Sequence, residues 1–144
     1  ATNVETTMRD GNSSIAIRSR FTVTDPAAVD DLTLRMKYDD GFVAYLNGHE
    51  VARRNAPAGA PTWNAAATAE RANSAALTFE AIDLSAYREH LLAGANANVL
   101  SIVGLNVSAG QRDFLVVPEV VATDSDFLDL IGRPQRKIVL PSHL

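Results

Sequence analysis

The fold is decided by the stretch Tyr38-Asp39-Asp40-Gly41-Phe42-Val43-Ala44-Tyr45-Leu46-Asn47-Gly48-His49-Glu50-Val51. An acidic turn that ends in glycine leads into a run of aromatic and β-branched residues, which favour strands. Asn47-Gly48 then supplies the two residues with positive φ that a type I′ turn needs, and the chain returns through Val51. The stretch predicts a β-hairpin, with Phe42, Tyr45 and Leu46 expected where two sheets meet.

Further strands are predicted on both sides of this hairpin. Residues 32–37 show the clearest alternation of apolar and polar side chains. Residues 99–106 are almost continuously apolar, which is typical of a strand buried on both faces. Pro118 interrupts the last strong strand and predicts an edge or a bulge there. The other predicted strands cover residues 15–23, 77–84 and 114–121.

Helical signals are few. Ser85 is a candidate N-cap for one short helix over residues 86–93, with Gly94 just past its end. Residues 4–8 predict a short edge strand or an irregular arm. Residues 64–76 have helical propensity but no large apolar residue at helical spacing, so a long exposed loop is at least as good an interpretation.

The composition limits the class of protein. A chain of 144 residues fits one domain, and the absence of cysteine removes disulfides and thiolate chemistry. A net charge of −4 with scattered basic residues argues against nucleic acid and against a membrane surface as partners. We expect a folded module over residues 1–122 and a linker or extension over residues 123–144. Because the sequence begins at Ala1 without a methionine, we expect a boundary inside a longer protein.

Strands that outnumber helices in this way predict an all-β fold, a β-sandwich. The hairpin sequence also resembles the signature of bacterial jelly-roll modules of the galactose-binding-like superfamily, in Asp39-Asp40-Gly41, Tyr45-Leu46-Asn47-Gly48 and Glu50-Val51. The resemblance extends over about residues 15–122. It departs from the family pattern where Gln111-Arg112 replaces two serines in a loop. It implies a jelly-roll β-sandwich with one short helix, in a non-catalytic module of a secreted or cell-surface bacterial protein.

Motifs for catalysis are absent from the sequence. It has no nucleophile elbow and no phosphate-binding loop, and none of the histidines has a second metal ligand at helical spacing. Asp39 and Asp40 are neighbours on a strand, so their side chains are expected to point to opposite faces and to cap the turn. We therefore expect no enzymatic activity.

One structural calcium ion is implied by the resemblance, because similar sandwich modules hold one where the first and last strands meet. Hard cations take clusters of carboxylate, amide and carbonyl oxygens. The residues that could supply them are Glu5, Asp10, Asn12 and Glu119.

Sugar binding needs an aromatic face for stacking and a rim of side chains that hydrogen-bond to hydroxyls. Trp63 lies in a polar loop, and the alternative is that it plugs the edge of the core. Arginine supplies most of the basic residues, and its planar fork suits carboxylate or sulfate groups on an acidic polysaccharide. The candidate ligand-binding residues are Trp63, Asn64, Arg54, Asn106, Arg112 and Asp113.

These features favour a monomeric carbohydrate-binding module that targets a larger extracellular or cell-surface protein to polysaccharide. Its partners would be a polysaccharide or oligosaccharide and the neighbouring domains of the same chain. The alternative is a structural spacer or protein-interaction domain without a sugar site, because a single tryptophan offers little stacking surface.

Overall fold

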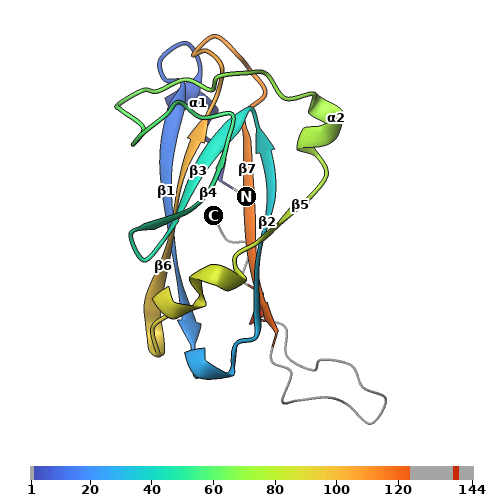
Figure 1. The fold of residues 1–144 in the computed structure, drawn as a ribbon. Coiled ribbons are helices and arrows are strands. Elements are labelled where there is room, and N and C mark those ends of the chain that lie inside the picture. Colours follow the sequence, from blue (N-terminus) through green and yellow to red (C-terminus); the bar gives the residue numbers. More distant parts are fainter. Residues whose placement is uncertain (1, 124–137, 140–144) are drawn as a thin grey trace.

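Two four-stranded antiparallel sheets pack face to face in a computed structural model, which describes residues 2–123, 138 and 139 (Figure 1). The first sheet has the strand order β1-β6-β3-β4, and the second has the order β5-β2-β7-β8. The prediction of an all-β sandwich is confirmed. The strands are β1 (Ser14–Val23), β2 (Asp31–Asp39), β3 (Gly41–Leu46), β4 (His49–Arg54), β5 (Glu80–Asp83), β6 (Gly94–Leu105), β7 (Leu115–Thr123) and β8 (Ile138–Val139).

The helices are all short, and there are more of them than the one that the sequence predicts. They are the α-helices α1 (Glu5–Met8) and α2 (Asn73–Ala76) and the 3-10 helices η1 (Pro26–Ala28) and η2 (Ser85–His90). The predicted helix over residues 86–93 is therefore a 3-10 helix that ends at His90. Ser85 is not its N-cap, because Leu84 takes that position and the Ser85 N–H donates to Asp83 Oδ1 at 2.8 Å.

The N-terminal arm differs from the predicted edge strand or irregular arm, since residues 5–8 form a single α-helical turn. The Glu5 N–H donates to Asn3 Oδ1 at 2.8 Å, which satisfies one of the free donors at the start of the turn. Arg9 then pairs with Glu5 at 2.8 Å, one helical turn away. Local polar contacts of this kind are enough to close one turn where no neighbouring strand is paired.

The hairpin forms as predicted, but one of its aromatic residues lies elsewhere. Asn47 and Gly48 have φ angles of 49° and 89° and join β3 to β4. Phe42 and Leu46 belong to the core between the sheets. Tyr45 does not, because the inward positions of β3 fall on Phe42, Ala44 and Leu46, which leaves the Tyr45 side chain half-buried on the outer face.

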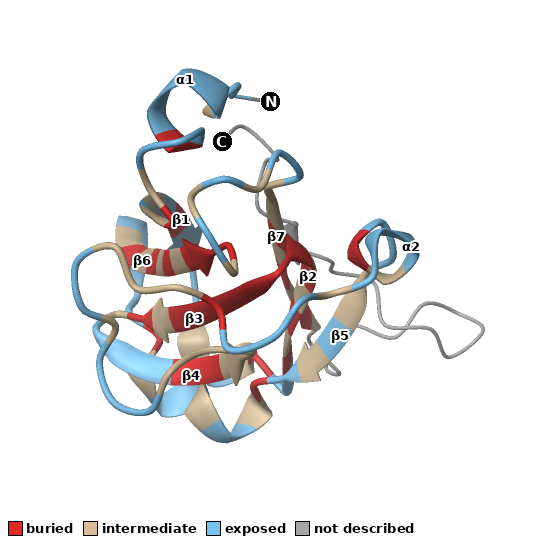
Figure 2. Cartoon of the chain, turned by 90° about the horizontal axis from the view of Figure 1, so that it is seen from above, coloured by how far each residue is buried: buried red, intermediate tan, exposed pale blue. Residues whose placement is uncertain are grey.

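The core occupies the space between the two sheets, and Figure 2 shows β3 buried along most of its length. The rings of Tyr38 and Phe42 meet edge to face across it, with centroids 4.7 Å apart. The largest fully buried side chains are Tyr38, Phe42, Leu32, Leu34, Met36, Leu46, Leu84, Leu100, Ile102, Leu105, Val23 and Val43.

Two strand predictions are refined by the structure. β6 is a central strand, but its burial alternates, so Leu100 and Ile102 face the core while Val99 and Val103 are only half-buried. The prediction of burial on both faces is therefore wrong. Pro118 pairs with Met36 of β2, and among the described residues β8 pairs only with Val121 and Ala122 of β7. Among the described residues, Pro118 therefore pairs on the β2 side of β7 alone, which agrees with the predicted edge position.

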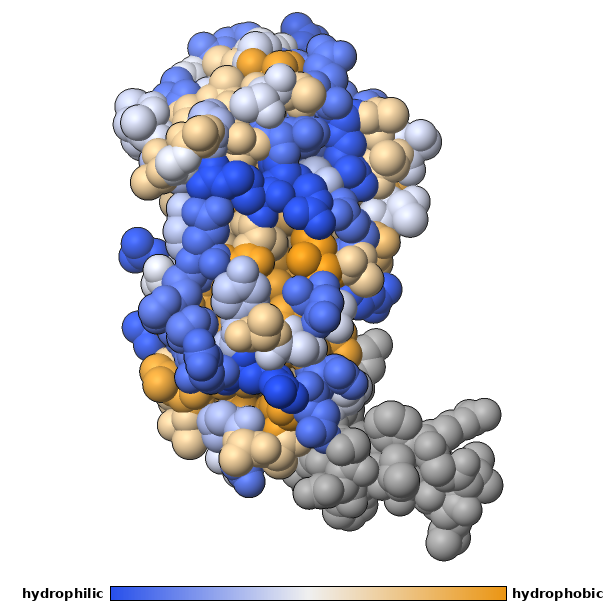
Figure 3. Space-filling view, viewed as in Figure 1, coloured by the Kyte–Doolittle hydropathy of each residue, from blue (hydrophilic) through white to orange (hydrophobic). Residues whose placement is uncertain are grey.

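The C-terminal region is described only in part. Residues 138 and 139 pair with β7 as the short strand β8, so this part of the predicted linker adds to the second sheet. The rest of the linker prediction, over residues 124–137 and 140–144, lies outside the described residues. No helix in the described part of the chain is long and apolar enough to cross a membrane. On the face shown in Figure 3, polar surface is interrupted by a smaller hydrophobic area near the middle.

Candidate functional site

Several loops gather at one end of the sandwich, which we call the loop end (Figure 1). It consists of residues 2–13, 39–41, 55–72 and 106–114. Hydrogen bonds join these segments to one another: the Asp10 N–H donates to Ala109 O at 2.9 Å, and the Ala67 N–H donates to Asn106 O at 2.8 Å. The loop end is therefore one connected surface built on the strand ends.

Two consecutive carboxyls are buried at the centre of the loop end. Asp39 is 4% exposed and Asp40 is 2% exposed, and the peptide bond between them is cis. Their side chains are hydrogen-bonded neighbours, so the expectation that they point to opposite faces is wrong. Asp40 does cap the surrounding loops, because its Oδ1 accepts from the Arg71 N–H and its Oδ2 from the Val107 N–H, both at 2.9 Å.

The environment of Asp39 disfavours its negative charge. Burial, the hydrogen bond with Asp40 and the charges of Asp40 and Asp113 together raise the pKa of Asp39 to about 7, against a smaller opposing effect of Arg71. The carboxyl of Asp39 therefore changes from its protonated to its charged form near neutral pH. Such a site offers two carboxylate groups to a cation that could replace the proton.

Asn106 is distant from this pair in the sequence but close to it in space, because its two chain neighbours, Leu105 and Val107, both hydrogen-bond to Asp40. It is 1% exposed, and its backbone is fixed by hydrogen bonds with Ser13 O and the Ala67 N–H. The next residue, Val107, donates to Asp40. The side-chain Oδ1 of Asn106 is buried without a hydrogen-bond partner. A buried amide oxygen of this kind costs free energy unless a donor or a cation occupies its free position.

A network of polar side chains is connected to the acidic pair through Arg71. Arg71, whose N–H caps Asp40, donates from its guanidinium to Tyr38 Oη at 2.6 Å and lies over the Tyr38 ring at 4.0 Å. Tyr38 in turn donates to Glu80 at 2.7 Å, and Arg54 pairs with the same carboxylate at 2.7 Å. Burial first, and then Glu80, raise the pKa of Tyr38 to about 12. Burial works to raise the pKa of Glu80 as well, but the hydrogen bonds from Tyr38 and Arg54 lower it overall.

Trp63 is on the outside of the loop end. Its side chain is 88% exposed, which excludes the alternative that it plugs the edge of the core. It is a large aromatic surface that makes no contribution to the packing between the sheets. An aromatic residue in this position is free to stack against a ligand.

The other predicted ligand-binding residues divide into two groups. Asn64 and Arg54 are engaged in structure: Asn64 Oδ1 accepts from the Ser13 N–H at 2.6 Å, and Arg54 pairs with Glu80. Arg112 and Asp113 lie in the exposed β6–β7 loop. Asp113 is close enough to Asp39 for its charge to raise the pKa of that residue.

The four predicted calcium ligands are engaged separately. Glu5 pairs with Arg9, and Glu119 pairs with Arg35 at 2.7 Å in the second sheet. Asp10 is exposed on the N-terminal arm, and Asn12 Nδ2 donates to Thr7 O at 2.7 Å. Within residues 2–123, no group of three or more His, Cys, Asp or Glu side chains could hold a metal ion. The acidic pair with Asn106 is a different donor set, because one of its oxygens comes from an amide.

The sequence identifies Asp39 and Asp40 but predicts only that they cap the turn. The signal that could have found the site is two consecutive acidic residues at a strand end, directly before a glycine that starts the next strand. Alternation predicts opposite faces for such a pair, and only the folded backbone shows that the carboxyls meet.

Comparison with known proteins adds little to these assignments. No family model matches the sequence, and no curated protein matches it. Among solved structures, the crystal structure of the PA14 domain of the MpAFP antifreeze protein is similar, with 13% sequence identity and a TM-score of 0.41. The match covers 92% of this chain and 51% of that chain, so this chain spans about half the length of that structure. A similarity of this degree assigns no role to any residue here.

Proposed function

We propose that this domain is a non-catalytic carbohydrate-binding module whose sugar site is the loop end. The observation that carries the proposal is the exposed Trp63 at the same end of the sandwich as a buried acidic pair and an unsatisfied amide oxygen. The module would attach a larger extracellular or cell-surface protein to polysaccharide. The neighbouring domains of that protein would be its other partners.

Trp63 supplies the surface for stacking. The apolar face of a pyranose ring packs against an indole ring, and an aromatic side chain that is already exposed binds without any rearrangement of the core. Trp63 is 88% exposed, and its loop is held in place because Asn64 Oδ1 accepts from the Ser13 N–H. A rigid loop with an exposed aromatic ring loses little conformational entropy on binding.

Asp39, Asp40 and Asn106 are the residues that would hold a calcium ion. Their oxygens are of the kind that calcium prefers, and Asn106 Oδ1 has no other partner. Calcium takes about 6–8 oxygen ligands, so these three buried side chains would supply only part of its coordination shell. We propose this donor set in place of Glu5, Asp10, Asn12 and Glu119, because Glu5 and Glu119 are already paired with arginines.

The test is a glycan-binding measurement on two variants, each of which removes one exposed apolar side chain. Trp63→Ala removes the proposed stacking surface, and Leu92→Ala removes another exposed apolar side chain, 51% exposed, beyond η2. Affinity electrophoresis on a panel of polysaccharides, with calcium and with a chelator, should show binding by the wild type and by Leu92→Ala. Trp63→Ala should lose about fivefold in affinity, since one stacking contact contributes about 1 kcal/mol.

The melting temperature separates this proposal from the alternative of a structural spacer. Because Trp63 contributes nothing to the core, Trp63→Ala should melt as the wild type does. A protein that binds no glycan with or without calcium, or a Trp63→Ala variant that binds as well as the wild type, would contradict the proposal. In that case, the spacer or protein-interaction function would be the better interpretation.

A further inference from the structure

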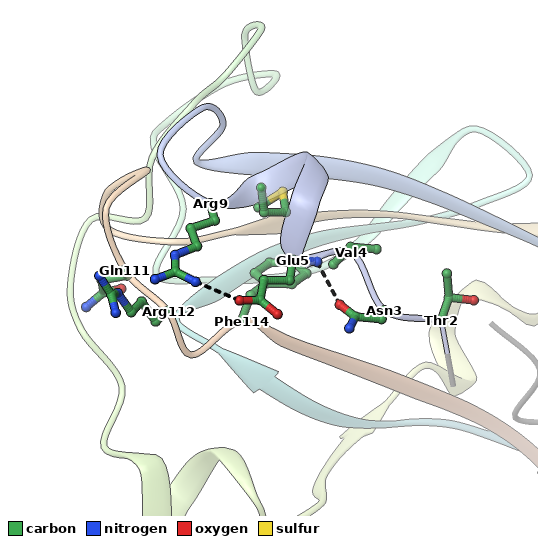
Figure 4. Close-up of a pocket in the computed structure, with 9 residues that line it drawn as sticks. Thr2, Asn3, Val4, Glu5, Arg9, Gln111, Arg112 and Phe114 are labelled. Carbon is green, nitrogen blue, oxygen red and sulfur yellow. Dashed lines mark hydrogen bonds and ion pairs between the residues drawn. The ribbon is translucent and has the colours of Figure 1, made fainter.

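A groove of about 250 Å³ lies within the loop end, between the N-terminal arm and the β6–β7 loop (Figure 4). Its apolar lining consists of Val4, Met8 and Phe114. Met8, the last residue of α1 in the arm, is buried. The Phe114 ring lies directly over Gly104 of β6. The groove is therefore anchored to the sandwich. Its polar lining consists of Thr2, Asn3, Glu5, Arg9, Gln111 and Arg112.

The charge of the groove is opposite to that of the molecule. The chain has a net charge of −4, whereas the lining of the groove contains two arginines and one glutamate. Arg9 uses its Nη1 for Glu5, at 2.8 Å. Arg112 makes no hydrogen bond or ion pair within the part of the chain that the structure describes. The planar guanidinium of Arg112 is therefore available to an oxyanion, which it can bind through two parallel hydrogen bonds.

Gln111 adds an unsatisfied acceptor next to this cation. Its Oε1 is buried without a hydrogen-bond partner, and its Nε2 lies 3.5 Å from Glu70 Oε1. Figure 4 shows Gln111 and Arg112 together at the end of the groove nearest to the Arg9 guanidinium. Gln111 lines the groove, and a rotation that turns its buried Oε1 into the groove would let a ligand hydroxyl donate to it, while a negative group on the same ligand meets the arginines.

We infer that the groove is a subsite for an acidic sugar unit, one that carries a carboxylate or sulfate on its ring. The oxyanion is bound by Arg112 with help from Arg9, a ring hydroxyl donates to Gln111, and the apolar face of the ring packs on Phe114 and Val4. This inference rests on the proposed carbohydrate-binding function and narrows it to acidic polysaccharides. The groove is close to the acidic pair, since Asp113 directly follows Arg112 and acts on Asp39.

The experiment uses matched ligands that differ only in charge. Oligouronides are titrated into the full chain by calorimetry, in parallel with the same oligouronides as neutral methyl esters. A sulfated oligosaccharide and its unsulfated parent form the second arm, which separates sulfate from carboxylate as the source of the negative charge. We expect one of the acidic forms to bind about tenfold tighter than its neutral partner, which corresponds to about 1.4 kcal/mol.

Variants test whether Arg112 is responsible. Arg112→Gln should reduce this preference to about twofold or less, because the neutral side chain cannot pair with the oxyanion. Arg112→Lys should retain part of the preference, because the charge remains while the fork is lost. Arg18→Gln is the matched control, since Arg18 is an exposed arginine on β1, and it should keep the full preference. Equal binding of acidic and neutral forms in both arms, or a full preference in Arg112→Gln, would overturn the inference.

A second measurement separates failure of this inference from failure of the proposed function. Backbone amide signals are recorded by NMR while monomeric uronate, and separately a sulfated monosaccharide, is added. Shifts at Gln111, Arg112 and Phe114 with one of these ligands, but not with a neutral sugar, would support the subsite even if no polysaccharide binds. Binding of glycans through Trp63 without any shift at these three residues would overturn the subsite and leave the carbohydrate-binding function standing.

Discussion

Asp39 is the residue on which the chemistry of the loop end depends. It is a carboxyl at the end of a central strand, almost completely buried, and it lies beside a second carboxyl. A buried charge needs a partner of opposite sign, and the positive charge of Arg71 has only a small opposing effect on the pKa of Asp39. The protein therefore tolerates Asp39 mainly by keeping it protonated, unless a cation takes the place of the proton.

The first prediction concerns the pH dependence of stability. The pKa of Asp39 rises from 3.8 to about 7 on folding, so the folded state binds this proton more tightly than the unfolded state. Its stabilising contribution is fully present below about pH 4 and is lost as the pH rises through about 7, a loss of roughly 4 kcal/mol at most. Asp39→Asn imitates the protonated form, so thermal melting without calcium should show a growing advantage of the variant from pH 4 to pH 8.

Wild type and Asp39→Asn must be compared at each pH, because other carboxyls change the stability with pH in the opposite direction. The pKa values of Glu80 and Asp83 are lowered in the folded protein, so their contributions are lost as the pH falls. The difference in melting temperature between wild type and Asp39→Asn cancels these shared effects. A difference that stays constant from pH 4 to pH 8 would show that Asp39 is not protonated in the fold.

Gly41 is a second residue that decides the local structure, because its position has no room for a side chain. A Cβ atom at this position would lie 2.6 Å from Asn55 O and 2.8 Å from Arg54 O, both backbone atoms that cannot move aside easily. Gly41→Ala should therefore lower the free energy of unfolding by ~1–3 kcal/mol. Gly110→Ala is the control, because the nearest atom to its Cβ would be Ser108 Oγ at 3.9 Å. Equal denaturation midpoints for the two variants would contradict this prediction.

At the scale of the elements, strand β3 shows which face of the hairpin stabilises the fold. Phe42 is fully buried between the sheets, whereas Tyr45 is half-buried on the outer face. Phe42→Ala should cost ~3–5 kcal/mol in the free energy of unfolding, and Tyr45→Ala should cost less than about half of that. Urea denaturation of both variants tests this difference. A larger loss from Tyr45→Ala would mean that the outer face of β3 is packed more tightly than its exposure indicates.

The same strand shows how far the sequence can predict the fold. The turn at Asn47-Gly48 follows from local chemistry, and the alternation over residues 32–37 correctly predicts which side chains of β2 face inward. In β3 every residue from Phe42 to Leu46 is apolar or aromatic, so no alternation distinguishes its two faces. The correct assignment depends on which face of β3 meets the second sheet, whose strands β5 and β7 are distant from β3 in the sequence.

The candidate site could be predicted only in part for a related reason. A polar loop around Trp63 predicts exposure, and the gathering of loops at one end follows from the general form of a sandwich. The meeting of the Asp39 and Asp40 carboxyls depends on the backbone path at the strand end. The roles of Arg54 and Asn64 depend on partners more than 20 residues away, Glu80 and Ser13, which no local pattern indicates.

At the scale of the whole molecule, the acidic pair is connected to the contact between the two sheets. Arg54 belongs to β4, an edge strand of the first sheet, and Glu80 belongs to β5, an edge strand of the second. Their ion pair at 2.7 Å bridges these two edges. Arg71 links this bridge to Asp40, because its N–H caps Asp40 while its guanidinium donates to Tyr38. A ligand of the acidic pair therefore acts on a network that holds the sheets together.

The last prediction follows from this connection and from the proton on Asp39. If calcium is bound by Asp39, Asp40 and Asn106, it stabilises only the folded state, by about 2.7 kcal/mol when its concentration is about 100 times its dissociation constant. At about pH 5.5 the ion must first displace the proton of Asp39, whereas at about pH 8.5 that proton is already lost. The rise in melting temperature on addition of calcium should therefore be larger at the higher pH and absent in Asp39→Asn. An equal rise at both pH values, or the same rise in Asp39→Asn, would place any bound calcium elsewhere in the molecule.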